Sequence, residues 1–547
     1  MTIMKKISFI ILALAASVLT SAAQDAYNIL SEEDITAKAK LSGITLGSRE
    51  VKKIVYEYPS TDAEGNAATV SGVIMIPMDV IDGTVPCDGV IMYNHPTIGS
   101  PEDAPSVGGE AYDALPIFLA SPLKPNYIAV ASDYVGYGSS IDHNVSYIGG
   151  DTNGRNCLDG LLAAFQLFED KQIPTGKYLF NLGYSQGGTE SMYAARLTDT
   201  EAKYKNIRFT KTFSGGGCLD IAKAFQIYVE NDHCEDLADV VLMVTSVNEN
   251  YHLGIPYDVI FKEPVASKAL EYFHSKDKSV VSAIGITSMD KVSDIITPEF
   301  LDPENEYAKC FMDKLNDISI TNGWEPDVTK QYYLAHSRHD NYVPIQSGRG
   351  MVTWMMENGF TPSIVPGKTS LQTCNVIFKL KHQQAAIVWA IQSIAAIQFW
   401  PVLYYEGELN RYYNDVVKDM NLLKVIKMLE SLGIDLRKLV NEAFSRGSLP
   451  THYTLFDLVP NIGDYLAKVN LTTDDLEEMC EDSGITMLDI MQALNYIQNG
   501  IEPDEAPAVN IEENVEVPLF LLRYYEQQLA NWFLLAGFDV NYNLWAM

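Results

Sequence analysis

Short, nearly continuous apolar runs alternate with helix-periodic segments over the first part of the chain. The runs at 88–95, 127–132, 178–182 and 206–213 are rich in β-branched and aromatic residues, as expected of strands buried on both faces. Between them, 153–169 places Leu158, Leu161 and Phe165 on one helical face. This alternation predicts an α/β protein with a mostly parallel sheet that is covered by helices on both sides.

The segments before this pattern predict different elements. Residues 51–58 and 68–76 read as an antiparallel pair of strands, because the turn-forming stretch 60–65 lies between them. Residues 27–41 combine helix formers with a spacing that we read as a short helix at the entry to the fold.

The strand pattern stops near residue 219 and returns near residue 331. Residues 219–324 show helical periodicity with almost no signal for a buried strand. Two crossover helices with long loops are the alternative, but loops of that length are uncommon in compact domains, and we therefore expect a helical cap domain. The expected elements after it are strands at 331–335, 363–365 and 376–380 and helices at 351–357 and 385–399.

The last part of the chain is acidic and mostly helical in its pattern. The segments that begin at Gly433 and Gly484 resemble each other loosely, which a divergent duplication and chance explain about equally well. Residues 501–514 contain two prolines and read as a linker, and 518–535 reads as a final apolar helix.

These changes of pattern divide the chain into five parts. The expected parts are a signal peptide at 1–23, a first part of the α/β core at 24–218, a helical cap insertion at 219–325, a second part of the core at 326–400, and a C-terminal helical region at 401–547.

The first residues have the pattern of a secretory signal peptide. Lys5 and Lys6 precede an apolar run at 7–19, and small residues follow, so cleavage is expected between Ala23 and Gln24. The apolar run is too short to span a bilayer, and no later stretch reaches that length without a charge or a proline. We therefore expect a secreted or periplasmic protein with no integral membrane segment in the mature chain.

Composition excludes some partners and suggests no cofactor. The formal net charge of the 547 residues is −32, and a surface this acidic repels nucleic acid and anionic membranes. The 7 cysteines are scattered without a Cys-x-x-Cys pair or a zinc-like spacing with histidine, and an odd number leaves at least one thiol unpaired within the chain. No metal or cofactor is implied.

A Gly-x-Ser-x-Gly motif stands between a predicted strand and a predicted helix. Ser185 occupies its centre, with Gly183 and Gly187 on either side. A side chain at either flanking position would collide with neighbouring backbone in the sharp turn, so glycine is required there and the Ser185 hydroxyl is exposed at the tip. The turn also directs the Gln186 backbone N–H toward the place where an oxyanion would form.

A carboxylate and an imidazole follow Ser185 in the order that a catalytic triad of this type requires. Asp340 comes after a late strand, in a loop that closes with Val-Pro, and His382 lies at a later strand-to-helix turn. His336 and His339 are alternative bases, but each is too close in sequence to Asp340 to bridge that carboxylate to Ser185.

The second oxyanion donor is expected in the loop that follows the strand at 88–95. Pro96 has no N–H, which leaves the backbone N–H of Thr97 as the first choice and that of His95 as the second.

Four motifs together resemble the secretory lipase, lipase A-like branch of the α/β-hydrolases. They are Gly183–Gly188, Asp133–Gly138, Ser214–Gly217 before a helical insertion, and His336–Pro344, and the resemblance extends over about residues 50–400. It implies a serine esterase or lipase with a helical cap over an acyl pocket. Pro96 departs from the glycine that many relatives have there, and the resemblance does not extend to residues 401–547.

The residues and the resemblance together predict a secreted serine hydrolase that cleaves carboxylic esters of small molecules or lipids. Ser185 is the expected nucleophile, His382 the base and Asp340 the residue that orients the imidazole, with Gln186 and Thr97 as oxyanion donors. Two alternatives remain, a serine peptidase with the same triad and a binding protein in which the triad is vestigial.

Overall fold

The computed structural model describes residues 26–41, 44–120, 126–337, 339–360, 362–363, 371–376, 380–403, 420–445, 455–479, 490 and 494. The predicted signal peptide at 1–23, the segment that begins at Gly484, the linker at 501–514 and the final helix at 518–535 lie outside the described residues.

Ten strands of the described chain form one mixed sheet in the order β1-β2-β3-β5-β4-β6-β7-β8-β10-β9. The strands are β1 (Asn28–Leu41), β2 (Ile44–Thr61), β3 (Ala67–Pro77), β4 (Gly89–Asn94), β5 (Tyr127–Ser132), β6 (Tyr178–Tyr184), β7 (Lys211–Gly215), β8 (Tyr332–Ser337), β9 (Pro362–Ser363) and β10 (Leu371–Val376). In this sheet order, every pairing from β1 through β2 and β3 to β5 is antiparallel. Every pairing from β5 through β4, β6, β7, β8 and β10 to β9 is parallel.

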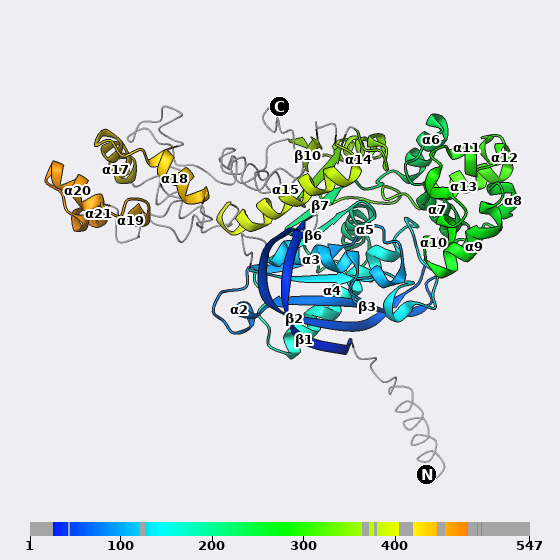
Figure 1. Ribbon diagram of the computed structural model, residues 1–547, viewed down its shortest axis with the longest axis horizontal. Helices are drawn as coiled ribbons and strands as arrows, with labels where there is room; N and C mark the ends of the chain where they lie inside the picture. Colours follow the sequence, from blue (N-terminus) through cyan, green and yellow to red (C-terminus); the bar gives the residue numbers. More distant parts are fainter. Residues whose placement is uncertain are drawn as a thin grey trace, which may run out of the picture.

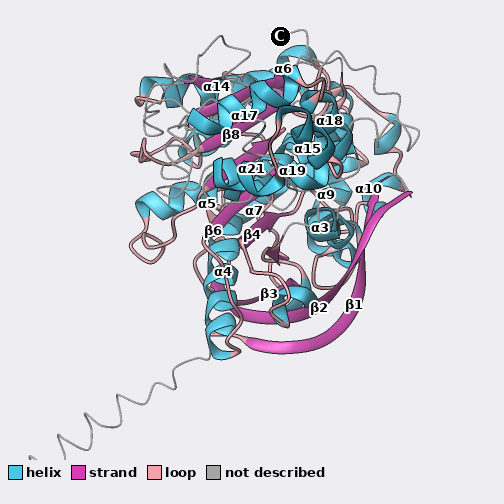
Figure 2. Cartoon of the chain, turned by 90° about the vertical axis from the view of Figure 1, so that its left-hand side faces the viewer, coloured by secondary structure: helices cyan, strands magenta, loops and turns pink. Residues whose placement is uncertain are grey.

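The segment 27–41 is a strand, so the prediction of a helix there is wrong. β1 pairs with β2 along its length, and Figure 2 shows the two as long curved strands at the edge of the sheet. Alternation decides the outcome: Ile35, Ala37 and Ala39 pack together on one face, while Asp34 pairs with Lys52 of β2. The partner strand outweighs the helix preference of the Ala, Glu and Lys residues in this segment.

The central strands are buried on both faces, as their apolar runs predict. In β4, Val90 and Met92 pack in one core with helices α4 (Thr152–Asp170) and α5 (Gln186–Thr200). Ile91 and Tyr93 point to the other face and join a second core. Helices therefore cover the parallel sheet on both sides, which is the predicted architecture.

The remaining described helices include those expected at 351–357 and 385–399 and several that were not individually predicted. They are α2 (Met78–Ile81), α3 (Glu110–Ala120), α6 (Ile221–Asn231), α7 (Leu237–Asn250), α8 (Tyr257–Ile260), α9 (Val265–Ser275), α10 (Ser279–Ser282), α11 (Val292–Ile295), α12 (Pro298–Leu301), α13 (Glu306–Asp317), α14 (Ile345–Glu357), α15 (His382–Leu403), α17 (Met420–Ser431), α18 (Leu436–Ser445), α19 (Leu455–Leu458), α20 (Ile462–Leu466) and α21 (Thr473–Met479). Short 3₁₀ turns are η1 (Pro101–Asp103), η2 (Gly138–Ser140), η3 (Ile286–Ser288) and η4 (Ala467–Val469).

Two predicted strands lie elsewhere than expected. The strand expected at 206–213 begins at Lys211, because the preceding residues form a turn in which Ile207 N–H donates to Tyr204. Most of the strand expected at 376–380 lies outside the described residues, and the described strand here is β10, Leu371–Val376, which aligns in parallel register with β8. β10 contains Gln372, Thr373 and Asn375, so an apolar pattern does not predict it. Its position is set by pairing with β8.

All the helices α6–α13 lie between β7 and β8 in the chain. Figure 1 shows them, in green, gathered at one end of the molecule, while α17–α21 lie at the other end. We call residues 219–325 the helical insertion. None of the described helices has both the length and the apolar character needed to cross a membrane.

Candidate active site

Ser185 stands at the corner between β6 and α5. Its backbone has φ +58° and ψ −126°, a conformation that a non-glycine residue adopts only when the surrounding structure imposes it. The Ser185 N–H donates to the carbonyl of Gly215 at the end of β7 (2.8 Å), which fixes the corner against the neighbouring strand. The side chain is half-buried, so the hydroxyl remains reachable at the tip of the turn.

Gly183 and Gly187 allow the backbone of this corner to pack closely. A Cβ added to Gly183 would lie 2.2 Å from the carbonyl oxygen of Gly187, and one added to Gly187 would lie 2.0 Å from that of Asn94. Both distances are far inside van der Waals contact. The steric requirement inferred from the motif is therefore present in the fold, and the strand ending at Asn94 is one of the surfaces that impose it.

Asp340 and His382 form a hydrogen-bonded pair. Asp340 Oδ2 lies 2.7 Å from His382 Nδ1, and Asp340 Oδ1 accepts the backbone N–H groups of Tyr342 and Val343 at 2.9 and 2.8 Å. Burial opposes ionisation of Asp340, but the hydrogen bond from His382 and the neighbouring imidazoles outweigh it, so the pKa of Asp340 is lowered. An ionised carboxylate accepts a hydrogen bond from Nδ1–H, and in the neutral imidazole of His382 this leaves the lone pair on Nε2.

His382 is held from several sides. Its backbone N–H donates to Asn341 Oδ1 (3.0 Å), and its backbone carbonyl accepts the hydroxyl of Tyr184 (2.7 Å). The ring of Tyr342 is stacked on the imidazole with 5.2 Å between ring centroids, and the Tyr184 ring lies 5.0 Å away. Gly216 also approaches closely, since a Cβ there would lie 3.1 Å from Cε1 of His382.

No hydrogen bond joins Ser185 to His382, although neighbours of Ser185 contact the imidazole. His382 Nε2 is buried and has no hydrogen-bond partner among the described residues. Tyr184, which precedes Ser185 in the chain, and Gly216, which follows the residue bonded to the Ser185 N–H, both lie against the imidazole.

The two expected oxyanion donors are placed differently. Gln186 is the first residue of α5, and the first N–H groups of a helix have no partner within it. Thr97 lies in the loop after β4, where its hydroxyl is 2.9 Å from the hydroxyl of Tyr147. Tyr147, Gln186 and Ser185 line one cavity, so the loop that carries Thr97 is connected to the wall of that cavity.

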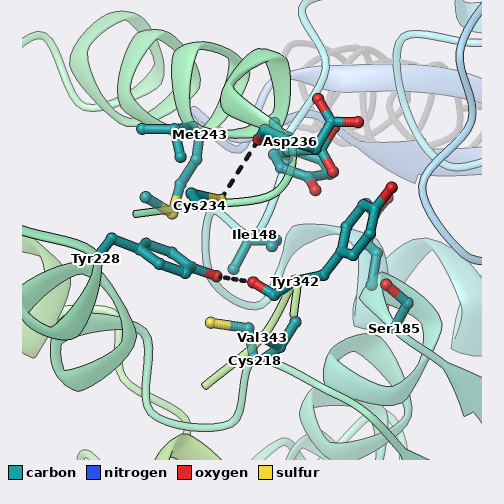
Figure 3. A pocket seen from close by; sticks show the side chains of 13 residues that line it. Ile148, Ser185, Cys218, Tyr228, Cys234, Asp236, Met243, Tyr342 and Val343 are labelled. Atoms are coloured by element: carbon teal, nitrogen blue, oxygen red, sulfur yellow. Dashed lines mark hydrogen bonds between the residues drawn. The ribbon is translucent and has the colours of Figure 1, made fainter. Parts of the chain in front are cut away.

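The helical insertion lines one side of the cavity beside Ser185. Its walls include Tyr228 of α6 and Asp239, Val240 and Met243 of α7. Figure 3 shows Ser185 on one side of this cavity, with Tyr342 next to it and Tyr228 on the opposite side. Helices that follow β7 in the chain thus supply the wall opposite the nucleophile.

The alternative histidines occupy other environments. His336 Nε2 donates a hydrogen bond to the carbonyl of Val343 (2.9 Å) and lies 3.5 Å from Asp340 Oδ2. The Nε2 proton is therefore hydrogen-bonded to the loop and not to the carboxylate. Burial lowers the pKa of His336. The side chain of His339 is exposed.

His95 and Asp133 belong to the core that supports the site. The His95 ring is stacked on Tyr134 with 3.9 Å between centroids, and burial lowers the pKa of His95 to about 4. Asp133 accepts the hydroxyl of Ser71 and the N–H of Ser106 at 2.5 and 2.7 Å. Within the described part of the chain, no group of three or more His, Cys, Asp or Glu side chains is arranged to hold a metal ion.

Several residues at the site carry no signal that sequence reasoning recognised. Asn341 and Tyr342 stand inside the His336–Pro344 motif, and Tyr184 stands inside the serine motif, so position next to a candidate residue was the available signal. Asp236 and Asp239 line the cavity from α7 and its N-terminal cap. Only the packing of the insertion against the sheet brings them there.

Solved structures with the same fold are similar to the described chain. A rice cell wall degrading esterase, LipA from Xanthomonas oryzae, aligns with a TM-score of 0.54 at 18% identity, covering 69% of this chain and 98% of that one. A protein from Legionella pneumophila with a provisional assignment as a hydrolase aligns with a TM-score of 0.56 at 17% identity, covering 69% and 98%. Comparison of the sequence with protein-family profiles and with curated proteins gives no match.

The sheet order, the helices on both faces and these structural neighbours agree. The seven strands β5, β4, β6, β7, β8, β10 and β9 are parallel to one another. The sharp turn at Ser185 lies between the central strand β6 and helix α5. The neighbours share this architecture over almost their whole length. The chain has the α/β-hydrolase fold.

Proposed function

We propose that this protein is a serine hydrolase that cleaves carboxylic esters through an acyl-enzyme. The observation that carries the proposal is the Asp340–His382 pair with an unpartnered, buried Nε2, beside a serine in a sharp strand-to-helix corner. Esterases are among the solved structures that share the fold, which agrees with this reading.

In this proposal Ser185 attacks the ester carbonyl and His382 Nε2 takes its proton. The imidazolium then donates that proton to the leaving alcohol, and in the second half-reaction it activates water against the acyl-enzyme. Asp340 keeps Nδ1 protonated and stabilises the imidazolium without taking the proton itself. The N–H groups of Gln186 and Thr97 stabilise the tetrahedral oxyanion.

Hydrolysis of p-nitrophenyl butyrate by the wild type and by Ser185→Ala tests the reaction. Removal of a triad nucleophile is expected to lower kcat by about three orders of magnitude or more. Ser288→Ala is the matched control, because Ser288 is an exposed serine of the helical insertion. Its activity should equal that of the wild type.

Labelling with a fluorophosphonate gives an independent readout. The reagent should modify the wild type at Ser185 and fail to modify Ser185→Ala. Equal, negligible ester turnover by both proteins together with no labelling would remove the ester hydrolase proposal. Labelling at Ser185 with turnover of peptide anilides alone would favour a peptidase.

We also propose that the chain is exported and cleaved between Ala23 and Gln24, and that residues 219–325 act as a cap over the ester site. N-terminal sequencing of the mature protein tests the cleavage position. The cap is supported by the position of α6 and α7 across the cavity from Ser185.

A further inference from the structure

The cavity beside Ser185 is small for a lipid chain. It measures about 40 Å³. A cavity needs roughly 10–15 Å³ to hold one water, so this cavity has room for only a few groups of that size. Ser185 and Gln186 lie on one side of it, which makes it the space that the acyl part of a bound ester would enter.

The side of the cavity opposite Ser185 is apolar and firmly built. Met243 and Val240 of α7 are buried there, and Tyr228 is fixed by a hydrogen bond of 2.7 Å from its hydroxyl to the Tyr342 carbonyl. In Figure 3, Met243 and Tyr228 lie away from Ser185, with Ile148 between them and the nucleophile. An acyl chain that enters from Ser185 would meet these side chains after a few atoms.

Ile148 narrows the cavity from the loop before α4. It is a buried, β-branched residue with φ +48°, a conformation that such residues rarely adopt. Its neighbours are bonded to the insertion: Tyr147 N–H donates to Ser246 Oγ (3.0 Å), and the Tyr251 hydroxyl donates to the Gly149 carbonyl (2.5 Å). Contacts on both sides therefore hold Ile148 in the cavity wall.

Charged groups occupy another side of the cavity. Asp236 and Asp239 line it, and the ammonium of Lys278 contacts Asp236 and lies 3.6 Å from Asp239 Oδ1. A long apolar chain that left the cavity on this side would have to displace water from these charges, which is costly. The charged side chains and the small volume of the cavity thus both disfavour a long acyl chain.

We propose that Ser185 acts on esters of short acyl groups, of about two to four carbons, and that Met243 and Ile148 set this limit. This inference rests on the proposed ester hydrolase function and narrows its substrate class.

The wild-type protein alone gives the first test. Its kcat/KM is measured with p-nitrophenyl acetate, butyrate and octanoate, with Ser185→Ala measured beside it. We expect kcat/KM to fall by about tenfold or more from butyrate to octanoate, since even one misplaced methylene in a tight pocket costs about that much.

Two variants test whether the named side chains set the limit. Met243→Ala removes part of the wall opposite Ser185, and Ile148→Gly opens the side wall with a residue that accepts positive φ. Each should raise the octanoate-to-butyrate ratio of kcat/KM by about tenfold. The matched control is Met355→Ala, because Met355 is a buried methionine of α14 that does not line the cavity. It should leave the ratio unchanged, and if Met243→Ala fails to fold, Ile148→Gly carries the test.

The possible results separate the two proposals. Ser185-dependent turnover that is faster with octanoate than with butyrate would overturn the short-chain inference and leave the hydrolase intact. A short-chain preference that neither variant changes would remove Met243 and Ile148 as its cause. No ester turnover and no fluorophosphonate labelling by the wild type would mean that the proposed function itself fails.

Discussion

The hydroxyl of Tyr184 donates a hydrogen bond of 2.7 Å to the backbone carbonyl of His382. Tyr184 is the last residue of β6 and precedes the proposed nucleophile, whereas His382 is the first residue of α15. One side chain thus ties the strand that presents Ser185 to the start of the helix that presents the imidazole. These two segments lie almost two hundred residues apart in the chain.

Tyr184→Phe should weaken both catalysis and the fold by similar small amounts. Loss of a hydrogen bond of this type costs about 0.5–1.5 kcal/mol, and an imidazole that is less well placed should lower kcat by about two- to tenfold. The measurement is kcat and KM for p-nitrophenyl butyrate, with thermal unfolding as the measure of stability.

Tyr332→Phe is the control for that experiment. Tyr332 is a buried tyrosine of β8 whose hydroxyl has no hydrogen-bond partner within the described chain. Removal of its hydroxyl should leave kcat unchanged and stability equal or slightly higher. Equal kcat in Tyr184→Phe and in the wild type would show that this bond does not position the base.

Asp340→Asn should abolish most of the activity in a folded protein. An amide at this position favours the wrong tautomer of His382 and cannot stabilise the imidazolium, and the expected loss of kcat is about 10⁴-fold. Circular dichroism checks the fold, and kcat with p-nitrophenyl butyrate checks the loss. His339→Gln is the control, because His339 is exposed next to Asp340 in sequence, and full activity there would exclude it as the base.

Gly187→Ala should damage the fold itself. The added methyl would lie 2.0 Å from the Asn94 carbonyl oxygen, so the corner must move or the sheet must open. The expected loss is about 3 kcal/mol of unfolding free energy, or no folded protein. Gly463→Ala is the control because a methyl on that residue of α20 would meet nothing within 4 Å. Urea unfolding of both variants distinguishes them.

Glu190 should make stability decrease as pH rises. Burial raises the pKa of this α5 carboxyl from 4.5 to about 8, although hydrogen bonds from Asn153 and Gln186 act in the opposite direction. The unfolded chain ionises near 4.5, so this contribution to stability is complete below that pH and is lost progressively up to about pH 8.

Glu190→Gln removes this titration. Relative to the wild type, the variant should gain on the order of 3 kcal/mol of unfolding free energy between pH 5 and pH 8. Urea unfolding at the two pH values measures the difference. If the difference between the two proteins were the same at both pH values, Glu190 would not carry a raised pKa.

The local part of the site was legible from the sequence. Gly183 and Gly187 avoid a backbone clash in the sharp turn at Ser185, and this requirement involves only five consecutive residues between a strand and a helix. Asp340 and His382 follow predicted strands and come after Ser185 in the expected order. In the structure, Asp340 Oδ2 lies 2.7 Å from His382 Nδ1. Order along the chain is informative here because strands of a parallel sheet end at a common edge.

The residues that were not predicted depend on contacts between distant segments. β1 is a strand only because β2 lies beside it, and its own composition favours a helix. The contact of Tyr342 with His382 joins the loop after β8 to the start of α15, and the contact of Asp239 with the cavity requires the insertion to pack against the sheet. The hydrophobic periodicity of a segment carries no information about its contacts with distant segments.

The position of the helical insertion has a consequence for how this protein can change. The insertion leaves the sheet after β7 and returns at β8, and these strands are hydrogen-bonded neighbours in which Gly215 pairs with Ala335. The insertion is thus one continuous stretch of chain between two neighbouring strands, and one block of helices can be exchanged for another without rethreading the sheet. Ser185, Asp340 and His382 all come from outside that block. A different set of helices over the proposed site requires a single graft, so the proposed substrate preference can change while these three residues stay in place.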